Sequence, residues 1–267
     1  MSDKTQAIAA EVLGALSNVK QIEAFTRRAG GLSLDEAYAV TAALRNLRIA
    51  RGEKPIGRKI GFTNRTIWDE YQVFAPIWGD MYDTTVQSGA KTLALAPFCE
   101  PRLEPEIFFR FRDAPKAGMD ERALLGCIGG VGHGFEIVQS LFRDWRFGAA
   151  DCVVGGGLHG AYVIGSTTPV PQNADALFAQ LSTFEIEILR DGEVVDRGQA
   201  PNVLDGPLSA LRHLVELLAD DSNNPPIQAG EIVTTGTVTR AFVIKPGERW
   251  QTRVYGLPLD GLDITFA

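Results

Sequence analysis

The stretch PRLEPEIFFR, residues 101–110, begins with alternating polar and apolar side chains and continues into an apolar run. Residues two apart share a face of a β-strand, so this pattern predicts a strand over 104–112 with Glu104 and Glu106 on one face, roughly 7 Å apart at Cα. Pro105 predicts that the strand is locally irregular or lies at the edge of a sheet.

Two carboxylates so close together repel each other unless they face solvent or share a hard divalent cation. Glu185 and Glu187 have the same spacing, in a regular amphipathic strand whose other face is filled by Phe184, Ile186 and Ile188. For that second pair we expect solvent exposure. Spacing alone leaves both interpretations open for Glu104 and Glu106.

A third carboxylate stands in the segment GHGFEIVQS, residues 132–140, which predicts an otherwise apolar strand around Glu136. A buried carboxylate without a partner is costly, so such a group tends to be protonated, paired or bound to a metal. Together with Glu104 and Glu106, water and a bidentate substrate, it would complete the octahedral oxygen shell that Mg²⁺ or Mn²⁺ prefers.

Adjacent basic residues, Arg58 and Lys59, stand in the β-like segment GRKIGFTN, residues 57–64. A lysine beside a bound cation has its ammonium form disfavoured, which suits it to acid/base work or to anchoring a substrate carboxylate. The alternative is a lysine exposed to solvent.

Short β-rich runs separated by Gly and Pro dominate the chain from about residue 56, and Asp191-Gly192 predicts a hairpin turn. Two amphipathic helices precede them, the second opened by a capping box of Ser33 and Glu36. Helices return only at about 120–129 and 206–219, so strands and helices do not alternate as in a doubly wound sheet. We expect an α+β fold, a mixed, largely antiparallel β-roll or sandwich with N-terminal helices.

The chain divides into a helical segment, 1–55, packed on a β-rich catalytic domain, 56–267. The later helix is expected to be capped by Asp205, with Pro207 in its first turn and Leu208, Leu211, Val215 and Leu218 as its apolar stripe.

The 267 residues are 45% hydrophobic and 22% charged, as in an ordinary globular protein. A net charge of −7 with scattered basic residues argues against nucleic-acid binding. Neither a signal peptide nor a membrane-spanning run is recognisable, so we expect a cytoplasmic, unanchored protein. The three cysteines are far apart and are interpreted as buried small hydrophobes in a reducing compartment.

Taken in order, residues 57–63, 102–106, 135–138 and 143–145 resemble the 2-hydroxypenta-2,4-dienoate (2-keto-4-pentenoate) hydratase and 4-oxalocrotonate decarboxylase group of the fumarylacetoacetase superfamily. The resemblance extends over nearly the whole chain, to the last β-rich run at 262–266. It implies the fold of the superfamily's C-terminal domain.

The resemblance places the family's acidic metal ligands on Glu104, Glu106 and Glu136 and its active-site lysine on Lys59. It implies hydration of a 2-hydroxy-2,4-dienoate, held with its C2 oxygen and carboxylate on Mg²⁺ or Mn²⁺, to a 4-hydroxy-2-keto acid. The alternatives are vinylogous decarboxylation of a 2-keto-dienedioate, hydrolysis of an acylpyruvate, and a non-catalytic keto-acid binder. Substrate contacts are expected among Arg58, Leu103, Gly157, Leu158 and His159.

One departure from the family concerns the pocket wall. Where typical hydratases carry an Asp-Asn-Ala-Ser stretch, this chain has Gly155, Gly156, Gly157 and Leu158. Lost polar groups predict a distal pocket that accepts larger or apolar groups and uses 4-oxalocrotonate poorly, unless His159 or an arginine replaces the contacts.

The remaining histidines and aromatics leave alternatives open. His133 could reach the metal or its surroundings, and with His159 it is one of two candidate bases for hydrolysis, whereas His213 is expected at the surface. The aromatics Trp68, Tyr71, Phe74 and Trp78 recur at helix-like spacing, which is typical of a core or a subunit interface. This aromatic stretch and the stripes of the N-terminal helices offer more apolar surface than two short helices need in order to pack on one sheet. We therefore expect a homo-oligomer.

Overall fold

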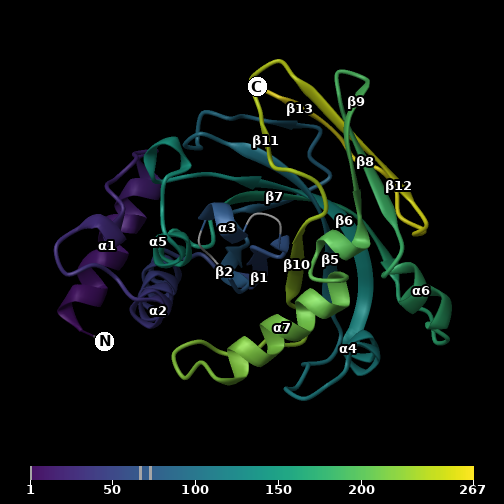
Figure 1. Ribbon diagram of the computed structural model, residues 1–267, viewed down its shortest axis with the longest axis horizontal. Helices are drawn as coiled ribbons and strands as arrows, with labels where there is room; N and C mark the ends of the chain where they lie inside the picture. Colours follow the sequence, from purple (N-terminus) through teal and green to yellow (C-terminus); the bar gives the residue numbers. More distant parts are fainter. Residues whose placement is uncertain (1, 66–67, 72–73) are drawn as a thin grey trace.

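A computed structural model describes residues 2–65, 68–71 and 74–267, and shows two curled β-sheets with helices around them (Figure 1). Among the described residues, one sheet has eight strands in the order β2-β1-β10-β5-β6-β7-β3, with β11 paired to β5. The other has five, in the order β4-β13-β12-β8-β9. Three strand pairs are parallel, namely β1 with β10, β3 with β7 and β4 with β13, and the others are antiparallel. The expected mixed, largely antiparallel α+β fold is therefore confirmed.

The strands of the larger sheet are β1 (Pro55–Gly61), β2 (Ile77–Tyr82), β3 (Val86–Ser88), β5 (Arg102–Phe111), β6 (Ile128–Val138), β7 (His159–Pro169), β10 (Ile232–Thr237) and β11 (Phe242–Val243). Those of the smaller sheet are β4 (Thr92–Leu93), β8 (Glu185–Arg190), β9 (Glu193–Gln199), β12 (Arg249–Tyr255) and β13 (Asp263–Phe266). The helices are α1 (Asp3–Ser17), α2 (Leu34–Ala50), α3 (Trp68–Tyr71), α4 (Glu121–Cys127), α5 (Ala149–Val154), α6 (Asp175–Gln180) and α7 (Pro207–Ala219), with short 3₁₀ turns at Phe25–Arg27, Arg143–Trp145 and Ala200–Asn202.

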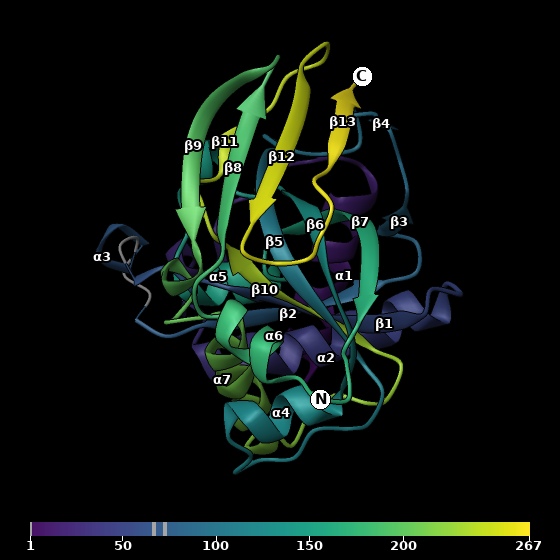
Figure 2. The ribbon, with the colours of Figure 1, turned by 90° about the vertical axis from the view of Figure 1, so that its right-hand side faces the viewer.

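The smaller sheet covers one face of the larger, as Figure 2 shows with β8, β9 and β12 in front of β5 and β6. An apolar layer fills the space between them, with Leu103, Phe135 and Ile137 from one sheet against Ile188 and Trp250 from the other. Successive side chains of a strand point to opposite faces, so every second side chain of β5 and β6 points away from this layer. The functional side chains lie on that opposite face.

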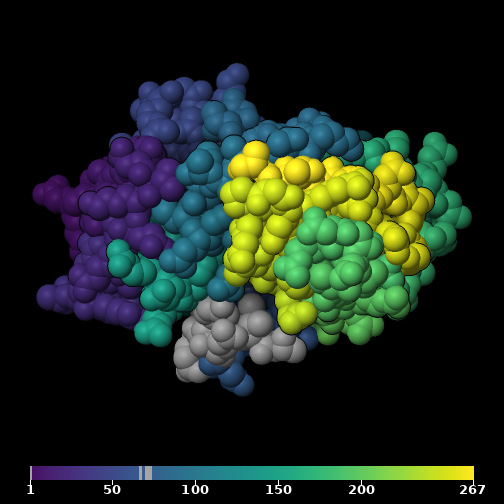
Figure 3. Space-filling model, turned by 90° about the horizontal axis from the view of Figure 1, so that it is seen from above, coloured from purple at the N-terminus to yellow at the C-terminus, as the bar shows by residue number. Residues whose placement is uncertain are grey.

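The N-terminal helices form the end of the molecule that is purple in Figure 3. Val12 of α1 and Val40 and Leu44 of α2 are buried in a cluster that includes α5 and Ile77 of β2. The predicted capping box is present, because Ser33 Oγ accepts from the Glu36 amide and the Glu36 carboxylate accepts from the Ser33 amide. The N-terminal helices therefore pack on the larger sheet through this cluster.

Four local expectations were wrong. The strand around Glu136 was expected within residues 132–140, but β6 begins at Ile128, because the glycines at 132 and 134 leave room for the rings of Phe108 and Tyr162. Trp78 lies in β2, not in a helix. Asp205 does not cap α7, whose N-cap is Gly206, and its carboxylate pairs with Arg65 instead.

The fourth concerns the strand that carries Glu104. β5 is not an edge strand, since β10 and β6 flank it on its two sides. The irregularity expected at Pro105 lies in the neighbour, as a register shift of β10 between Thr234 and Thr237. The hairpin at Asp191-Gly192 and the buried stripe of α7 are confirmed. No helix in the described part of the chain is long and apolar enough to cross a membrane.

Candidate metal centre and active site

Three carboxylates from two neighbouring strands meet on the inner face of the larger sheet. In the antiparallel register of β5 and β6, Glu104 stands directly opposite Glu136, and Glu106 opposite Gly134. One carboxylate oxygen from each glutamate lies within 4.8 Å of those of the other two. Glu106 and Glu136 are fully buried, and Glu104 is half-buried. The sheet therefore assembles a compact site for a cation.

The register shift in β10 supplies one of the few hydrogen bonds at this cluster. It turns the amide of Gly236 toward Glu106, whose Oε2 accepts from it at 3.0 Å. The other oxygen of Glu106, Oε1, is buried and has no hydrogen-bond partner among the described residues. A buried carboxylate oxygen left without a partner is costly and is suited to ligating a cation.

Glu136 is held between a histidine and a lysine. Its Oε1 lies 2.8 Å from Nδ1 of His159, and its Oε2 lies 3.2 Å from Nζ of Lys59. Burial lowers the pKa of His159 to about 3, so its ring is neutral. An ionised carboxylate only accepts hydrogen bonds, and Nδ1 of the neutral ring therefore carries the proton that it shares with Glu136. Nε2 on the other side lies 2.9 Å from Oγ1 of Thr85.

Lys59 extends from β1 across β10 to reach the cluster, because the sheet is strongly curled. Burial lowers the pKa of its ammonium, but the negative charges of Glu136, Glu104 and Glu106 outweigh burial and raise the pKa overall. From the sequence we expected a bound cation to disfavour the ammonium form of Lys59. The three carboxylates instead favour that form. A divalent cation among those carboxylates would offset part of this effect.

Burial in the cluster disfavours the charged form of the glutamates, whereas the charged form of Lys59 is favoured. Burial, only partly offset by Lys59, raises the pKa of Glu104 to about 8, and burial also raises the pKa of Glu106 and Glu136. Two buried carboxylates and a half-buried one beside a single lysine leave an excess of negative charge. Their all-oxygen donor set matches Mg²⁺ or Mn²⁺, and the residues present fit a divalent cation.

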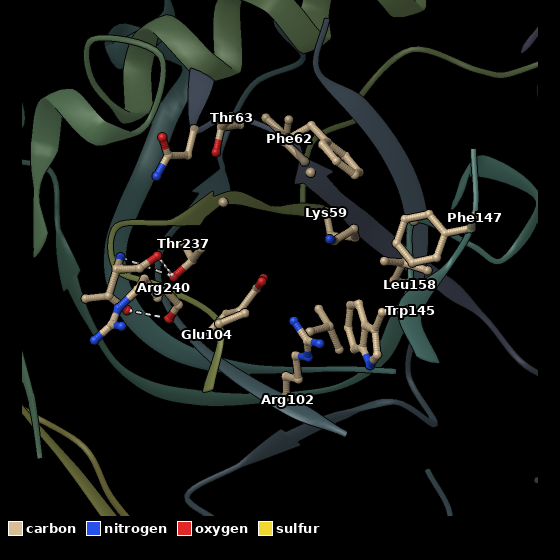
Figure 4. A pocket seen from close by; sticks show the side chains of 18 residues that line it. Lys59, Phe62, Thr63, Arg102, Glu104, Trp145, Phe147, Leu158, Thr237 and Arg240 are labelled. Atoms are coloured by element: carbon tan, nitrogen blue, oxygen red, sulfur yellow. Dashed lines mark hydrogen bonds between the residues drawn. The ribbon is translucent and has the colours of Figure 1, made fainter. Parts of the chain in front are cut away.

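A cavity of about 380 Å³ opens over this centre (Figure 4). In the figure Lys59 and Glu104 lie between two walls, with Arg102 and Trp145 on one side and Thr237 on the other. The lining also includes Phe62, Thr63, Asn64, Val138, Phe147, Gly157, Leu158, Gly236, Thr239, Arg240 and Ala241. Of these, Arg102 could have been found from the sequence, because it precedes Glu104 by two residues and shares its strand face. Gly157 and Leu158 were expected as substrate contacts, whereas nothing in the sequence indicated Thr237, Thr239 or Arg240.

Comparisons with known proteins give relatives of two named activities. No family model matches the chain. A curated 2-keto-4-pentenoate hydratase of Paraburkholderia xenovorans is 29% identical over 227 residues, which cover 85% of this chain and 82% of that one. A 4-oxalocrotonate decarboxylase of a Pseudomonas species is 27% identical over 217 residues, 81% of each chain. The chain is thus similar over most of its length to 2-keto-4-pentenoate hydratases and to a 4-oxalocrotonate decarboxylase.

Solved structures agree as well. The 4-oxalocrotonate decarboxylase of Pseudomonas putida G7, complexed with calcium and acetate, has a TM-score of 0.88 and 25% identity and covers 99% of this chain and 98% of that one. The same enzyme complexed with magnesium and adipate superimposes with a TM-score of 0.91 at 24% identity, which shows the shared fold.

Several predicted site residues lie outside the cavity. The side chain of Arg58 points away from that of Lys59 and pairs with Asp80, at 3.1 Å between Nε and Oδ1. Leu103 is buried in the layer between the two sheets. His159 does not line the cavity and contacts Glu136 from behind. Only Gly157 and Leu158, of the five expected substrate contacts, line it.

The other histidines and the comparison pair of glutamates also differ from expectation. His133 lies on the reverse face of β6, where Nδ1 is 2.9 Å from the Glu106 carbonyl oxygen and Nε2 is 2.9 Å from Oγ1 of Thr252. It does not reach the metal centre. His213 is half-buried on α7. Glu185 is exposed as expected, but Glu187 is buried under Arg197 and Arg253.

The glycine run has a packing role. Gly156 and Gly157 have φ of +72° and +68°, a conformation that strains other residues. A Cβ on Gly157 would lie 2.8 Å from Cδ of Lys59, and one on Gly79 would lie 2.1 Å from the carbonyl oxygen of Gly156. The run therefore turns tightly against β2 and leaves room for the lysine.

Proposed function

We propose that this protein is a divalent-metal-dependent hydratase that converts a 2-hydroxy-2,4-dienoate into a 4-hydroxy-2-keto acid. The observation that carries the proposal is the convergence of three carboxylates and a buried lysine beside one cavity, which Glu104 and Lys59 line. Relatives named for hydration of 2-keto-4-pentenoate and 2-hydroxyhexa-2,4-dienoate support the reaction class.

Glu104, Glu106 and Glu136 would hold the cation, with Mg²⁺ or Mn²⁺ as the ion. A bound cation would supply charge stabilisation for the enolate of a 2-keto acid, as is common in hydration and ketonisation. His159 would hold the Glu136 carboxylate in place, and the amide of Gly236 would do the same for Glu106.

Lys59 would exchange protons with the substrate. In the reaction, the enol proton of the dienoate is lost and C5 gains a proton, giving the conjugated 2-keto acid. Water then adds its oxygen to C4 and a proton to C3. The ammonium of Lys59, kept charged by its carboxylate neighbours, would donate one of these protons and take one back.

Decarboxylation is the second candidate, because a decarboxylase stands among the relatives. Acylpyruvate hydrolysis is less well supported. It needs a base near the carbonyl, and the described lining of the cavity includes no histidine.

The test is to incubate the protein with Mg²⁺ and 2-hydroxypenta-2,4-dienoate and to identify the product by NMR. We expect 4-hydroxy-2-oxopentanoate. Release of CO₂ from 4-oxalocrotonate without hydration of the dienoate would move the assignment to the decarboxylase. A protein that binds pyruvate but does not exchange its C3 protons with solvent deuterium would be a binder only.

A further inference from the structure

The short turn Arg143–Trp145, which brings Trp145 into the cavity wall, has a strained backbone. Asp144 and Trp145 follow each other with φ of +57° and +56°, and Glu100, which contacts both, has φ of +46°. This left-handed conformation is unfavourable for residues with a side chain, and for a residue as bulky as tryptophan it is a clear outlier. Such strain persists only where the surrounding contacts impose it, and it is concentrated at functional sites.

Glu100 supplies the contacts that hold this turn. Its Oε1 accepts a hydrogen bond from the backbone amide of Asp144 at 3.2 Å, and its backbone carbonyl oxygen accepts from the indole Nε1 of Trp145 at 3.1 Å. The side-chain amide of Gln21 donates to the same Oε1 at 2.6 Å and so fixes the carboxylate in turn. Glu100 itself does not line the cavity. One residue outside the cavity therefore holds both the strained backbone and the indole ring.

The indole held in this way gives the cavity an apolar surface. Trp145 stands beside Arg102 in the wall (Figure 4), with the guanidinium carbon 4.0 Å from the ring centroid. Nε1 is the only polar atom of the indole, and its bond to Glu100 leads out of the cavity. The rest of the ring is carbon, and the ring of Phe147, with its centroid 6.1 Å away, extends this surface.

We infer that Glu100 is a positioning residue, which holds the strained turn so that the Trp145 indole packs against the carbon chain of the substrate. This inference rests on the proposed function, because it assigns the C1 carboxylate and C2 oxygen of a 2-keto acid to the metal centre. The glycine run only lacks polar groups. The turn at Trp145 adds a carbon surface against which an apolar chain can be buried.

The test compares the binding of two saturated keto acids, pyruvate and 2-oxohexanoate, by calorimetry with Mg²⁺ present. Both carry the same 2-keto acid group, and the second has three more methylene groups. We expect the wild-type protein to bind 2-oxohexanoate at least about tenfold more tightly, because those methylene groups leave water for the wall. Glu100→Ala should reduce the preference to less than about threefold and change the affinity for pyruvate less than about twofold.

Glu100→Gln tests the role of the carboxylate oxygen, because its side-chain carbonyl can still accept from the Asp144 amide. This variant should keep the wild-type preference. Glu185→Ala is the matched control, since it removes an exposed glutamate of the smaller sheet, and it should keep the preference as well.

Trp145→Ala shows whether Glu100 acts through the indole. This variant should itself lose the preference for 2-oxohexanoate while still binding pyruvate. Adding Glu100→Ala to it should then cause no further loss, because two residues that act through one contact have non-additive effects. Additive losses in the double variant would mean that the two residues act separately, and would overturn the inference.

Three other results would also overturn it. One is equal weakening of pyruvate and 2-oxohexanoate in Glu100→Ala, which would give Glu100 a role in the fold or at the metal centre. The second is a loss of preference in Glu100→Gln as large as that in Glu100→Ala. The third is a preference that is unchanged in Glu100→Ala or missing from the wild-type protein.

These probes also separate the inference from the proposed reaction, since binding of saturated acids requires no turnover. If the wild-type protein hydrates no dienoate, the proposed function fails. A preference for 2-oxohexanoate that depends on Glu100 and Trp145 would still support the positioning role in that case.

Discussion

The contact between His159 and Glu136 is the most specific polar interaction at the centre. The neutral ring can donate through Nδ1 to a single carboxylate oxygen, while Thr85 contacts its other nitrogen. Hydrogen bonds of this kind orient a ligand before the metal arrives, and their loss costs about 10- to 100-fold in metal affinity. We therefore infer that His159 positions Glu136 from behind the pocket.

We predict that His159→Leu weakens Mn²⁺ binding at least about tenfold, measured by calorimetry. His159→Asn should retain most of the affinity, because its side-chain amide can replace the Nδ1 donor. His213→Leu, on α7 and away from the cavity, is the control and should bind as the wild type does. An affinity unchanged in His159→Leu would show that the contact does not position Glu136.

Lys59 is predicted to be catalytic. Lys59→Met keeps most of the side-chain length and removes the proton-transfer group, so the rate of hydration should fall about 10²-fold or more. Circular dichroism should show an unchanged fold, and Mn²⁺ should still bind. Activity within a few-fold of the wild type would leave Lys59 with a structural role.

At the scale of elements, the glycine run that turns against β2 sets the position of the lysine. We predict that Gly157→Ala costs about 1–2 kcal/mol of stability from its positive φ and also lowers the hydration rate, because the new methyl group meets Lys59. Gly118→Ala shares a positive φ, +78°, with nothing within 4 Å of its Cβ. It should be destabilised to a similar extent and keep full activity. Equal rates in the two variants would contradict the packing role.

The sequence predicts elements better than it predicts how they meet. Alternation in β5 places Glu104 and Glu106 on one face, and the apolar strand around Glu136 marks a buried carboxylate. Whether these strands are neighbours is a matter of register and non-local pairing, which no local pattern carries. The role of His159 was missed for the same reason, since its partner is 23 residues earlier, on β6.

Other differences between the sequence-based expectations and the structure lie at glycines, whose lack of a side chain lets other groups approach closely. Glycine has a low strand propensity, so the sequence does not show how far β6 extends before Gly132; the rings of Phe108 and Tyr162 occupy the space beside Gly132 and Gly134. The register shift that brings the Gly236 amide to Glu106 follows from the pairing of β10 with β5, not from the composition of β10.

At the scale of the whole molecule, part of the apolar surface from which we expected a homo-oligomer is buried within the chain itself. Trp78 is 1% exposed in the core, and Val12 of α1 is fully buried, whereas Phe74 is 59% exposed. Tyr71, whose side chain lies outside the described part of the structure, does not enter the comparison. We still predict an oligomer by light scattering at micromolar concentration, because exposed aromatics commonly mark interfaces. A monomer at that concentration would contradict this prediction.

The central claim is that three glutamates bind one divalent cation together, and calorimetric titration of Mn²⁺ tests it most directly. The wild-type protein should bind one ion per chain, and Glu104→Ala and Glu136→Ala should each lose most of that affinity, because the remaining carboxylates cannot complete the oxygen shell. Glu185→Ala removes an exposed carboxylate of the other sheet and should bind as the wild type does. Wild-type affinity in Glu136→Ala would contradict the account.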